Sequence, residues 1–146
     1  MRTLLILFCL ALALPLGAQD LRQNHAKTVR DFVAASNRHD VAAMLAATEE
    51  EFRWIQVVGD RTTVEVAGHA DLRSWLESYF VGTPDARSEL QAVQVHGAFA
   101  STVETTSWTS ESGARETHSA TSVYQFGPDG RIRFVWYFSA QPVAAP

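Results

Sequence analysis

Residues 115–138 read RETHSATSVYQF, GPDG and RIRFVWYF, two strand-like runs on either side of a turn rich in glycine, proline and aspartate. A turn of this composition closes a β-hairpin. If Phe126 and Ile132 share a face, the even positions of both runs collect Tyr124, Phe126, Ile132, Phe134, Trp136 and Phe138. The odd positions collect mainly polar residues, among them Thr117, Ser119, Thr121, Gln125, Arg131 and Arg133. This alternation predicts an antiparallel sheet with one face on a core.

The rest of the chain supplies helices that cover this face. Apolar residues at helical spacing predict helices at residues 20–37, 41–47 and 68–80, the second of them capped by Asp40. Alternating runs predict strands at residues 52–58, 62–66, 88–95, 99–110, 115–126 and 131–139. This order predicts an α+β fold, a cone-shaped curved antiparallel sheet wrapped over three N-terminal helices. The open end of such a cone is the default place for a ligand.

The two ends of the chain are expected to lie outside the domain. Residues 1–18 predict a secretory signal peptide, because Arg2 precedes an apolar run at residues 4–14 and a cleavage site after Ala18. That run is too short to span a bilayer, so we expect export to a periplasm or the medium and no stable membrane anchor. Residues 140–146 form a Pro/Ala-rich tail that is expected to be disordered. A single domain at residues 19–139 remains.

Charge and motifs argue against several classes of function. The net charge of −4 comes without a basic cluster, so nucleic acid is not an expected partner. No phosphate-binding glycine loop or G-x-S-x-G elbow is present, so no cofactor and no covalent hydrolase chemistry are expected. The five histidines have no HxH or HxxxH spacing, and no metal site is expected. His25 and His39 are expected to face water or cap a helix end, His96 to lie at a rim, and His69 in the first turn of the third helix.

Two short motifs resemble a known superfamily. Asn37 and Asp40 form an asparagine-x-x-aspartate between the first two helices, and residues 126–132 form an F-x-x-D-G-x-I hairpin. Residues 23–138 resemble the nuclear-transport-factor-2-like superfamily, and its SnoaL-like and ketosteroid-isomerase-like branch is the most similar. The resemblance implies a cystatin-like cone. It leaves the chemistry open, because the superfamily includes isomerases, cyclases, dehydratases, epoxide hydrolases and pure binding modules.

Ketosteroid isomerisation is not expected. The resemblance places Phe32 where the isomerases carry an oxyanion-donating tyrosine, Gln56 where they carry the general base, and Ser122 where they carry a protonated acid. Neither Phe32 nor Gln56 accepts a proton at neutral pH, so the catalytic set is incomplete. These residues remain candidates for contact with a ligand.

Glu104 is the candidate acid or base. Continuing the even positions upstream places this carboxylate on the apolar face, where desolvation raises a pKa. His118 lies on the same predicted face one strand away, so the two residues together suggest proton transfer. Two alternatives stay open: a shifted register would send Glu104 to solvent, and a Glu–His pair can be purely structural.

Aromatic residues are the candidate walls of a pocket for a flat, apolar ligand. The preferred set is Trp54, Trp108, Tyr124 and Trp136, although such residues are more often simply core. The opposite sheet face is predicted to carry Thr105, Ser107, Thr109, Thr117, Ser119, Thr121, Val123, Val135 and Tyr137. In the families that the chain resembles, this face often meets its copy in a homodimer, so a polar dimer interface and plain solvent are both open.

Three hypotheses of function follow. The first is a binding domain for a small hydrophobic molecule, which predicts a co-purifying ligand. The second is an isomerase-, cyclase- or dehydratase-type enzyme that uses Glu104 with His118, which predicts that Glu104→Gln loses turnover and keeps binding. The third is a protein-interaction module, which predicts a filled cavity and a stable partner complex.

Overall fold

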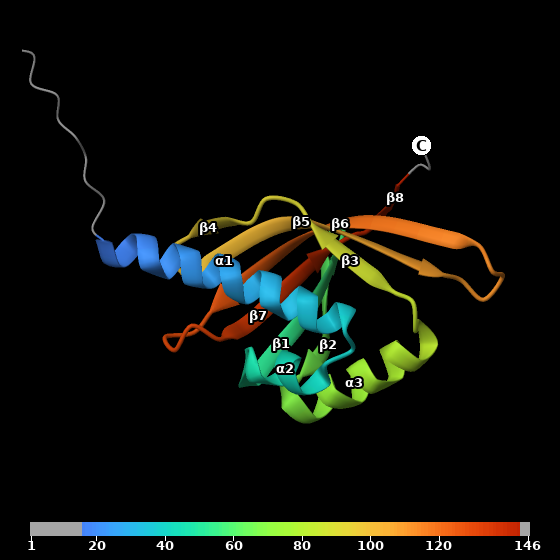
Figure 1. The fold of residues 1–146 in the computed structure, drawn as a ribbon, viewed down its shortest axis with the longest axis horizontal. Coiled ribbons are helices and arrows are strands. Elements are labelled where there is room, and N and C mark those ends of the chain that lie inside the picture. The colour runs from blue at the N-terminus through green and yellow to red at the C-terminus, as the bar shows by residue number, and fades with distance from the viewer. Residues whose placement is uncertain (1–15, 144–146) are drawn as a thin grey trace, which may run out of the picture.

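The computed structural model describes residues 16–143, with side chains from residue 24 onward, and confirms the α+β fold class (Figure 1). The helices are α1 (Leu16–Asn37), α2 (Val41–Ala46) and α3 (Gly68–Gly82). The strands are β1 (Thr48–Val58), β2 (Arg61–Ala67), β3 (Arg87–Leu90), β4 (Gln94–His96), β5 (Phe99–Thr109), β6 (Arg115–Phe126), β7 (Ile132–Phe138) and β8 (Gln141–Pro142). Residues 1–15 of the predicted signal peptide and residues 144–146 of the predicted tail lie outside the described range.

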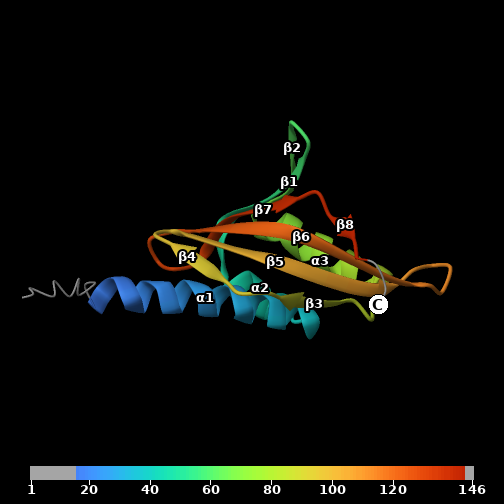
Figure 2. The same ribbon diagram turned by 90° about the horizontal axis from the view of Figure 1, so that it is seen from above.

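The hairpin of residues 115–138 forms the middle of the sheet. The strand order is β2-β1-β7-β6-β5-β3, with β4 also pairing to β5 and β8 to β6. Every pair is antiparallel except β1 with β7, which are parallel, a pairing that the sequence did not predict. Figure 2 shows α1 lying along one side of the sheet and the tip of the β1–β2 hairpin projecting from the body.

The asparagine-x-x-aspartate motif joins the first two helices to the sheet. Asn37 donates from Nδ2 to the Ser88 carbonyl and accepts from the Ser88 backbone N–H, both at 2.8 Å, so the end of α1 is clamped to β3. Asp40 accepts a 2.9 Å hydrogen bond from the backbone N–H of Ala43 and caps α2 as predicted. His39 between them has a φ of 56°, in the left-handed region that tight helix–helix turns use.

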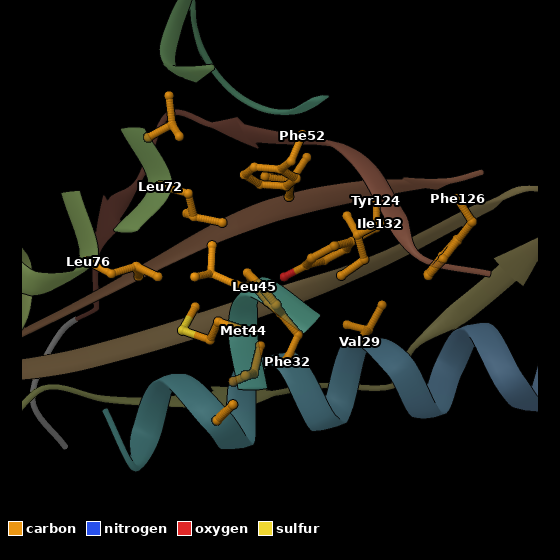
Figure 3. Packing of buried hydrophobic residues seen from close by; sticks show 14 of the residues in the cluster. Val29, Phe32, Met44, Leu45, Phe52, Leu72, Leu76, Tyr124, Phe126 and Ile132 are labelled. Carbon is orange, nitrogen blue, oxygen red and sulfur yellow. The ribbon is translucent and has the colours of Figure 1, made fainter. Parts of the chain in front are cut away.

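The core lies between the helices and the concave face of the sheet (Figure 3). Its largest fully buried side chains are Tyr124, Phe52, Met44, Leu72, Leu76 and Ile132. Each large apolar side chain buried in this way contributes about 1.5–3 kcal/mol of transfer free energy. None of the helices within residues 16–143 is long and apolar enough to cross a membrane.

The predicted face of β7 is wrong after Ile132. Ile132 pairs with Phe126, yet the next pair along joins Phe134 to Gln125, so β7 contains one residue more than β6 at this point. Such a bulge turns every following side chain to the other face. Val135 is therefore fully buried, while Phe134 and Trp136 stack on each other on the outer face, 5.5 Å apart.

Two further predictions, of the strand at residues 88–95 and of the tail, differ from the structure. The run at 88–95 is broken into β3 and β4, because one extra residue lies between the pairs Leu90–Glu104 and Gln94–Ser101. The tail expected to be disordered begins with β8, which pairs with Ser119 and His118. The reason is that β7 ends opposite the middle of β6, which leaves backbone groups of β6 free to accept another strand.

Two histidines expected to face water or cap a helix end pack against aromatic rings, His25 buried and His39 half-buried. His25 is 6% exposed, stacks on Phe126 with ring centroids 4.0 Å apart, and donates from Nδ1 to the Gly97 carbonyl at 3.2 Å. It lies four residues before Val29, on the same core-facing stripe of α1. His39 stacks on Phe80 of α3 at 4.3 Å.

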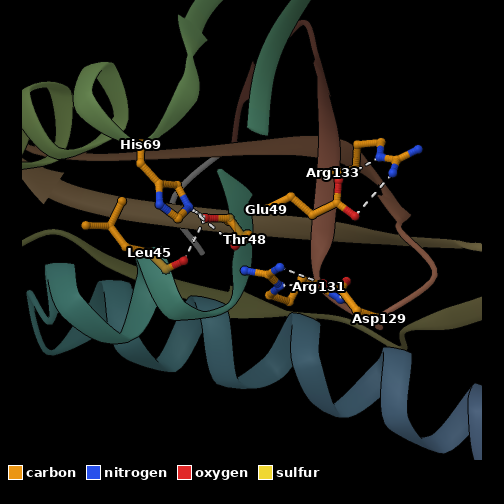
Figure 4. Close-up of polar contacts among 7 residues, drawn as sticks. All are labelled: Leu45, Thr48, Glu49, His69, Asp129, Arg131 and Arg133. Atoms are coloured by element: carbon orange, nitrogen blue, oxygen red, sulfur yellow. Dashed lines mark hydrogen bonds and ion pairs between the residues drawn. The ribbon is translucent and has the colours of Figure 1, made fainter. Parts of the chain in front are cut away.

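A cluster of polar contacts connects α2, α3 and the β1–β7 pair (Figure 4). The fully buried Thr48 donates from Oγ1 to the Leu45 carbonyl at 3.0 Å, and His69 Nε2 lies 2.9 Å from the same hydroxyl. Arg133 donates from Nε to Glu49 at 2.7 Å. We call this group, Leu45, Thr48, Glu49, His69 and Arg133, the junction cluster. Its contacts position the start of β1 against β7.

Candidate functional site

A cavity of about 410 Å³ lies between the helices and the concave face of the sheet. Side chains from every helix and from five strands line it: Phe32, Val33, Ser36, Met44, Trp54, Trp75, Leu76, Tyr79, Ser88, Glu104, Thr106, Trp108, His118, Ala120 and Tyr137. Thr83 and Ala140 complete its rim. The walls are mainly apolar and aromatic, with a few polar groups between them, which is the usual composition of a small-molecule site.

Glu104 is the only carboxylate on the cavity lining of the described chain. Its place in the middle of β5, opposite Ala120 of β6, turns it towards the helices, and it is 8% exposed. The sequence prediction that this carboxylate is buried on the covered face is therefore confirmed. Its Oε2 accepts hydrogen bonds from the hydroxyl of Tyr137 and, at 3.4 Å, from that of Tyr124.

Burial changes the acid–base properties of this cluster. Desolvation raises the pKa of Glu104, and hydrogen bonds from Tyr137, Ser88 and Tyr124 act in the opposite direction. Burial, followed by the charge of Glu104, raises the pKa of Tyr137 and of Tyr124. The two tyrosines therefore stay protonated as donors, while Glu104 keeps its proton to a higher pH than a carboxyl group in water.

His118 lines the same cavity but does not contact Glu104. It is paired with Thr106 across β5 and β6, and its ring lies edge-on to Trp108 with centroids 5.0 Å apart. Its Nε2 lies 3.9 Å from Oε2 of Glu116, a residue that does not line the cavity. Within the described residues, the groups that hydrogen-bond to Glu104 are Tyr137, Tyr124 and Ser88, so the predicted Glu–His pair shares a pocket without a hydrogen bond or ion pair between its members.

A continuous stack of four aromatic rings forms one wall. Tyr137 stacks on Trp54 with centroids 4.8 Å apart, Trp54 packs against Trp75 at 4.8 Å, and Trp75 stacks on Tyr79 at 5.0 Å. The stack begins at the hydrogen bond to Glu104 and continues along α3. It provides a large, rigid and apolar contact surface.

The predicted ligand-binding residues separate into two groups. Phe32, Trp54 and Trp108 line the cavity, and Tyr124 lies beneath it with its hydroxyl on Glu104. Gln56, Ser122 and Trp136 do not line it. Ser122 is fully buried behind the wall, and its Oγ has no hydrogen-bond partner within the described residues.

The prediction missed three aromatic residues of the lining for two different reasons. Trp75 and Tyr79 are four residues apart on α3, and this helical spacing indicated a shared buried face without indicating a pocket. Tyr137 was assigned to the outer face, because the β7 bulge has no signal in the alternation of apolar residues. Within residues 16–143, no three His, Cys, Asp or Glu side chains converge to hold a metal ion.

Comparison with known proteins connects this geometry to a family. The model of the SnoaL-like domain matches residues 29–135. A cystatin-fold protein from Novosphingobium aromaticivorans aligns with a TM-score of 0.69 and 21% identity, over 79% of this chain and 97% of its own. An M. tuberculosis LEH-like epoxide hydrolase aligns with a TM-score of 0.68 and 17% identity, over 80% and 83% of the two chains.

A third structure is that of SalBIII, an epoxide hydrolase/cyclase-like enzyme with a role in pyran ring formation in the polyether salinomycin. It aligns with a TM-score of 0.67 and 19% identity, over 80% of this chain and 90% of its own. At these identities the structural matches show the fold alone. Comparison with curated proteins finds no match. Because the family model covers most of the sequence, the chain belongs to the SnoaL-like domain family.

Proposed function

We propose that this SnoaL-like domain binds a small hydrophobic molecule in the cavity that contains Glu104. The observation that carries the proposal is the cavity itself, about 410 Å³ of space inside an otherwise close-packed core. Its walls combine a rigid aromatic stack with a few polar groups on one side, which suits a flat molecule with one polar end.

Filling the cavity tests this proposal. Ala120 lies on the cavity lining, and Ala120→Phe places a ring inside it. The matched control is Thr121→Phe, on the exposed outer face of the same strand. Nile red, a neutral hydrophobic dye, is expected to gain fluorescence with the unchanged protein and with Thr121→Phe, and to lose that gain with Ala120→Phe. Equal fluorescence from both variants contradicts binding in the cavity.

A second candidate is an enzyme of isomerase, cyclase or dehydratase type. A specific observation favours it: burial raises the pKa of Glu104, as it does for carboxyl groups that act as acids or bases in enzymes. Tyr137 would hold the carboxylate in place, and His118 on the neighbouring strand β6 would be a second proton carrier.

Isotope exchange tests proton transfer without knowledge of the natural substrate. A tetralone, a bicyclic ketone with an acidic α-hydrogen, is incubated with the protein in D₂O and followed by NMR. We expect exchange above the buffer rate that is lost in Glu104→Gln and retained in Glu116→Gln, which removes a half-buried carboxylate outside the cavity. Equal exchange in both variants rules out Glu104 as the acid or base for this class of ketone.

We also propose that the outer sheet face forms a homodimer. The β7 bulge supports this, because it adds Phe134 and Trp136 to a face that the alternation predicted to be polar. Trp136→Arg is expected to shift the protein towards the monomer in analytical ultracentrifugation. Sedimentation as a monomer before the substitution contradicts the proposal.

Export is the remaining proposal. It rests on the apolar run and the small-residue cleavage site at residues 1–18. The mass of the chain recovered from the medium or a periplasmic extract is expected to correspond to a first residue at Gln19. A full-length mass there contradicts cleavage.

A further inference from the structure

Glu104 has no positively charged partner within the described residues. The ion pairs of the structure join Lys27–Asp31, Arg38–Asp40, Arg115–Asp85, His118–Glu116, Arg131–Asp129 and Arg133–Glu49, and none of them includes Glu104. Among the residues that the structure describes, no lysine or arginine lines the cavity. A carboxylate removed from water is costly unless a cation or several donors compensate it.

The groups that face Glu104 compensate it only in part. Tyr137 of β7 and Tyr124 of β6 both donate to the same oxygen, Oε2. Burial raises the pKa of Tyr79 of α3, and the charge of Glu104 adds to this rise. His118 of β6 is the basic side chain on the lining, and it forms no ion pair with Glu104. Ser88 of β3 is a further donor that acts on Glu104. Both tyrosines bond to Oε2 and neither bonds to Oε1, which leaves Oε1 for a group in the cavity to contact.

We propose that the ligand itself supplies the missing cation, so that the preferred ligand is a hydrophobic amine with a flat apolar body. The proposal rests on the proposed function and makes it more specific. The ammonium group donates to Glu104, and the apolar body lies against the wall that includes Trp54 and Trp75. A charge-assisted hydrogen bond to a buried carboxylate is stronger than a neutral one.

Binding of such a cation is coupled to a proton. Where Glu104 is protonated in the free protein, an ammonium ligand binds as an ion pair only if the carboxyl proton leaves to the buffer. The protonated amine and the neutral acid thus give the ion pair and one released proton. A neutral ligand of the same shape releases none.

Three ligands of matched shape separate the possibilities. Naphthylmethylamine is a cation at neutral pH, naphthylmethanol is neutral, and naphthoic acid is an anion. Each is titrated calorimetrically into the full chain, into Glu104→Gln and into the control Glu116→Gln. The titrations are repeated in buffers of different ionisation enthalpy, which counts the protons released.

We expect the amine to bind at least about tenfold more tightly than the alcohol, a ratio that corresponds to 1.4 kcal/mol. Glu104→Gln is expected to abolish this preference and the proton release, while Glu116→Gln keeps both. The acid is expected to bind most weakly. Near-ultraviolet circular dichroism of both variants shows whether the aromatic wall is intact.

The outcomes separate failure of this inference from failure of the proposed function. If the alcohol binds as tightly as the amine, or more tightly, the cavity binds ligands and the inference is wrong. An amine preference that survives in Glu104→Gln also overturns it, because the cation is then recognised elsewhere. If none of the three ligands binds and Nile red does not bind, the proposed function itself fails.

Discussion

The Thr48 hydroxyl and the Glu104 carboxylate are both buried polar groups, yet their surroundings are opposite. In the junction cluster, Thr48 donates a hydrogen bond to the Leu45 carbonyl and lies 2.9 Å from His69. In the pocket, Glu104 accepts hydrogen bonds on one oxygen from two tyrosines and borders the cavity of about 410 Å³. The first arrangement is complete within the protein, and the second is not.

The difference separates a structural polar cluster from a candidate functional one. Buried polar groups in a stable fold are paired, so a closed cluster needs no explanation beyond stability. A buried carboxylate on a cavity, without a cation among the described residues, costs stability and has to be explained by another advantage. The comparison predicts that removal of the Thr48 hydroxyl and neutralisation of Glu104 change stability in opposite directions.

The largest expected effect is in the junction cluster. Thr48→Val keeps the shape of the side chain and removes the hydroxyl that bonds to Leu45 and His69. Because the Leu45 carbonyl and the half-buried His69 both lose this partner, we expect a loss of about 1–3 kcal/mol in the free energy of unfolding. Urea denaturation followed by far-ultraviolet circular dichroism measures this loss. Unchanged stability means that the cluster is not what positions β1.

The opposite sign is expected for Glu104→Gln at neutral pH. The folded pKa of Glu104 is raised above the ordinary value of 4.5, so the folded state holds a proton that the unfolded state releases as the pH rises from that value. The unchanged protein therefore loses stability as the pH rises from the unfolded pKa to the folded pKa, by about 1.4 kcal/mol for each pH unit between these two pKa values. The variant has no such loss.

Melting temperatures of both proteins from acid to neutral pH check this prediction. The two curves are expected to converge at low pH and to separate above the unfolded pKa, with Glu104→Gln the more stable protein. A variant that melts lower at every pH shows instead that the carboxylate is a paired structural group like Thr48.

The sequence predicted the fold better than the pocket, and particular residues show why. The alternation in residues 115–126 placed Glu104, Ser122 and Tyr124 on the covered face, because strand pairing carries this period across neighbouring strands. The same rule failed after Ile132. One extra residue there places Tyr137 on the covered face and Trp136 on the outer face, the reverse of the prediction. A bulge in β7 depends on the pairing of this strand with both β1 and β6, and the local sequence pattern of β7 does not predict that pairing.

The exchange of these two residues gives the third prediction. Tyr137→Phe removes the hydrogen bond to Glu104 and leaves the stacking of the ring on Trp54 in place. Because that bond favours the ionised carboxylate, its loss is expected to raise the pKa of Glu104 further and to lower stability by about 0.5–1.5 kcal/mol. The stability loss with pH then extends to higher pH than in the unchanged protein.

Trp136→Phe is the matched control for this measurement, since Trp136 is the neighbouring aromatic residue on the outer face. It is expected to leave the dependence of stability on pH as it is. If Tyr137→Phe and Trp136→Phe give the same pH profile, the hydroxyl of Tyr137 has no influence on Glu104.

The smallest effect is expected at the outer end of the junction cluster. Arg133 donates to Glu49 at 2.7 Å, but 43% of the Arg133 side chain is exposed to solvent. Exposed ion pairs contribute little, because water and salt screen them. Arg133→Gln is therefore expected to lower the urea midpoint far less than Thr48→Val does. Added salt should remove the remaining difference between Arg133→Gln and the unchanged protein. A loss as large as that of Thr48→Val, unaffected by salt, would mean that the Arg133–Glu49 ion pair stabilises the fold as strongly as the buried hydrogen bonds of Thr48.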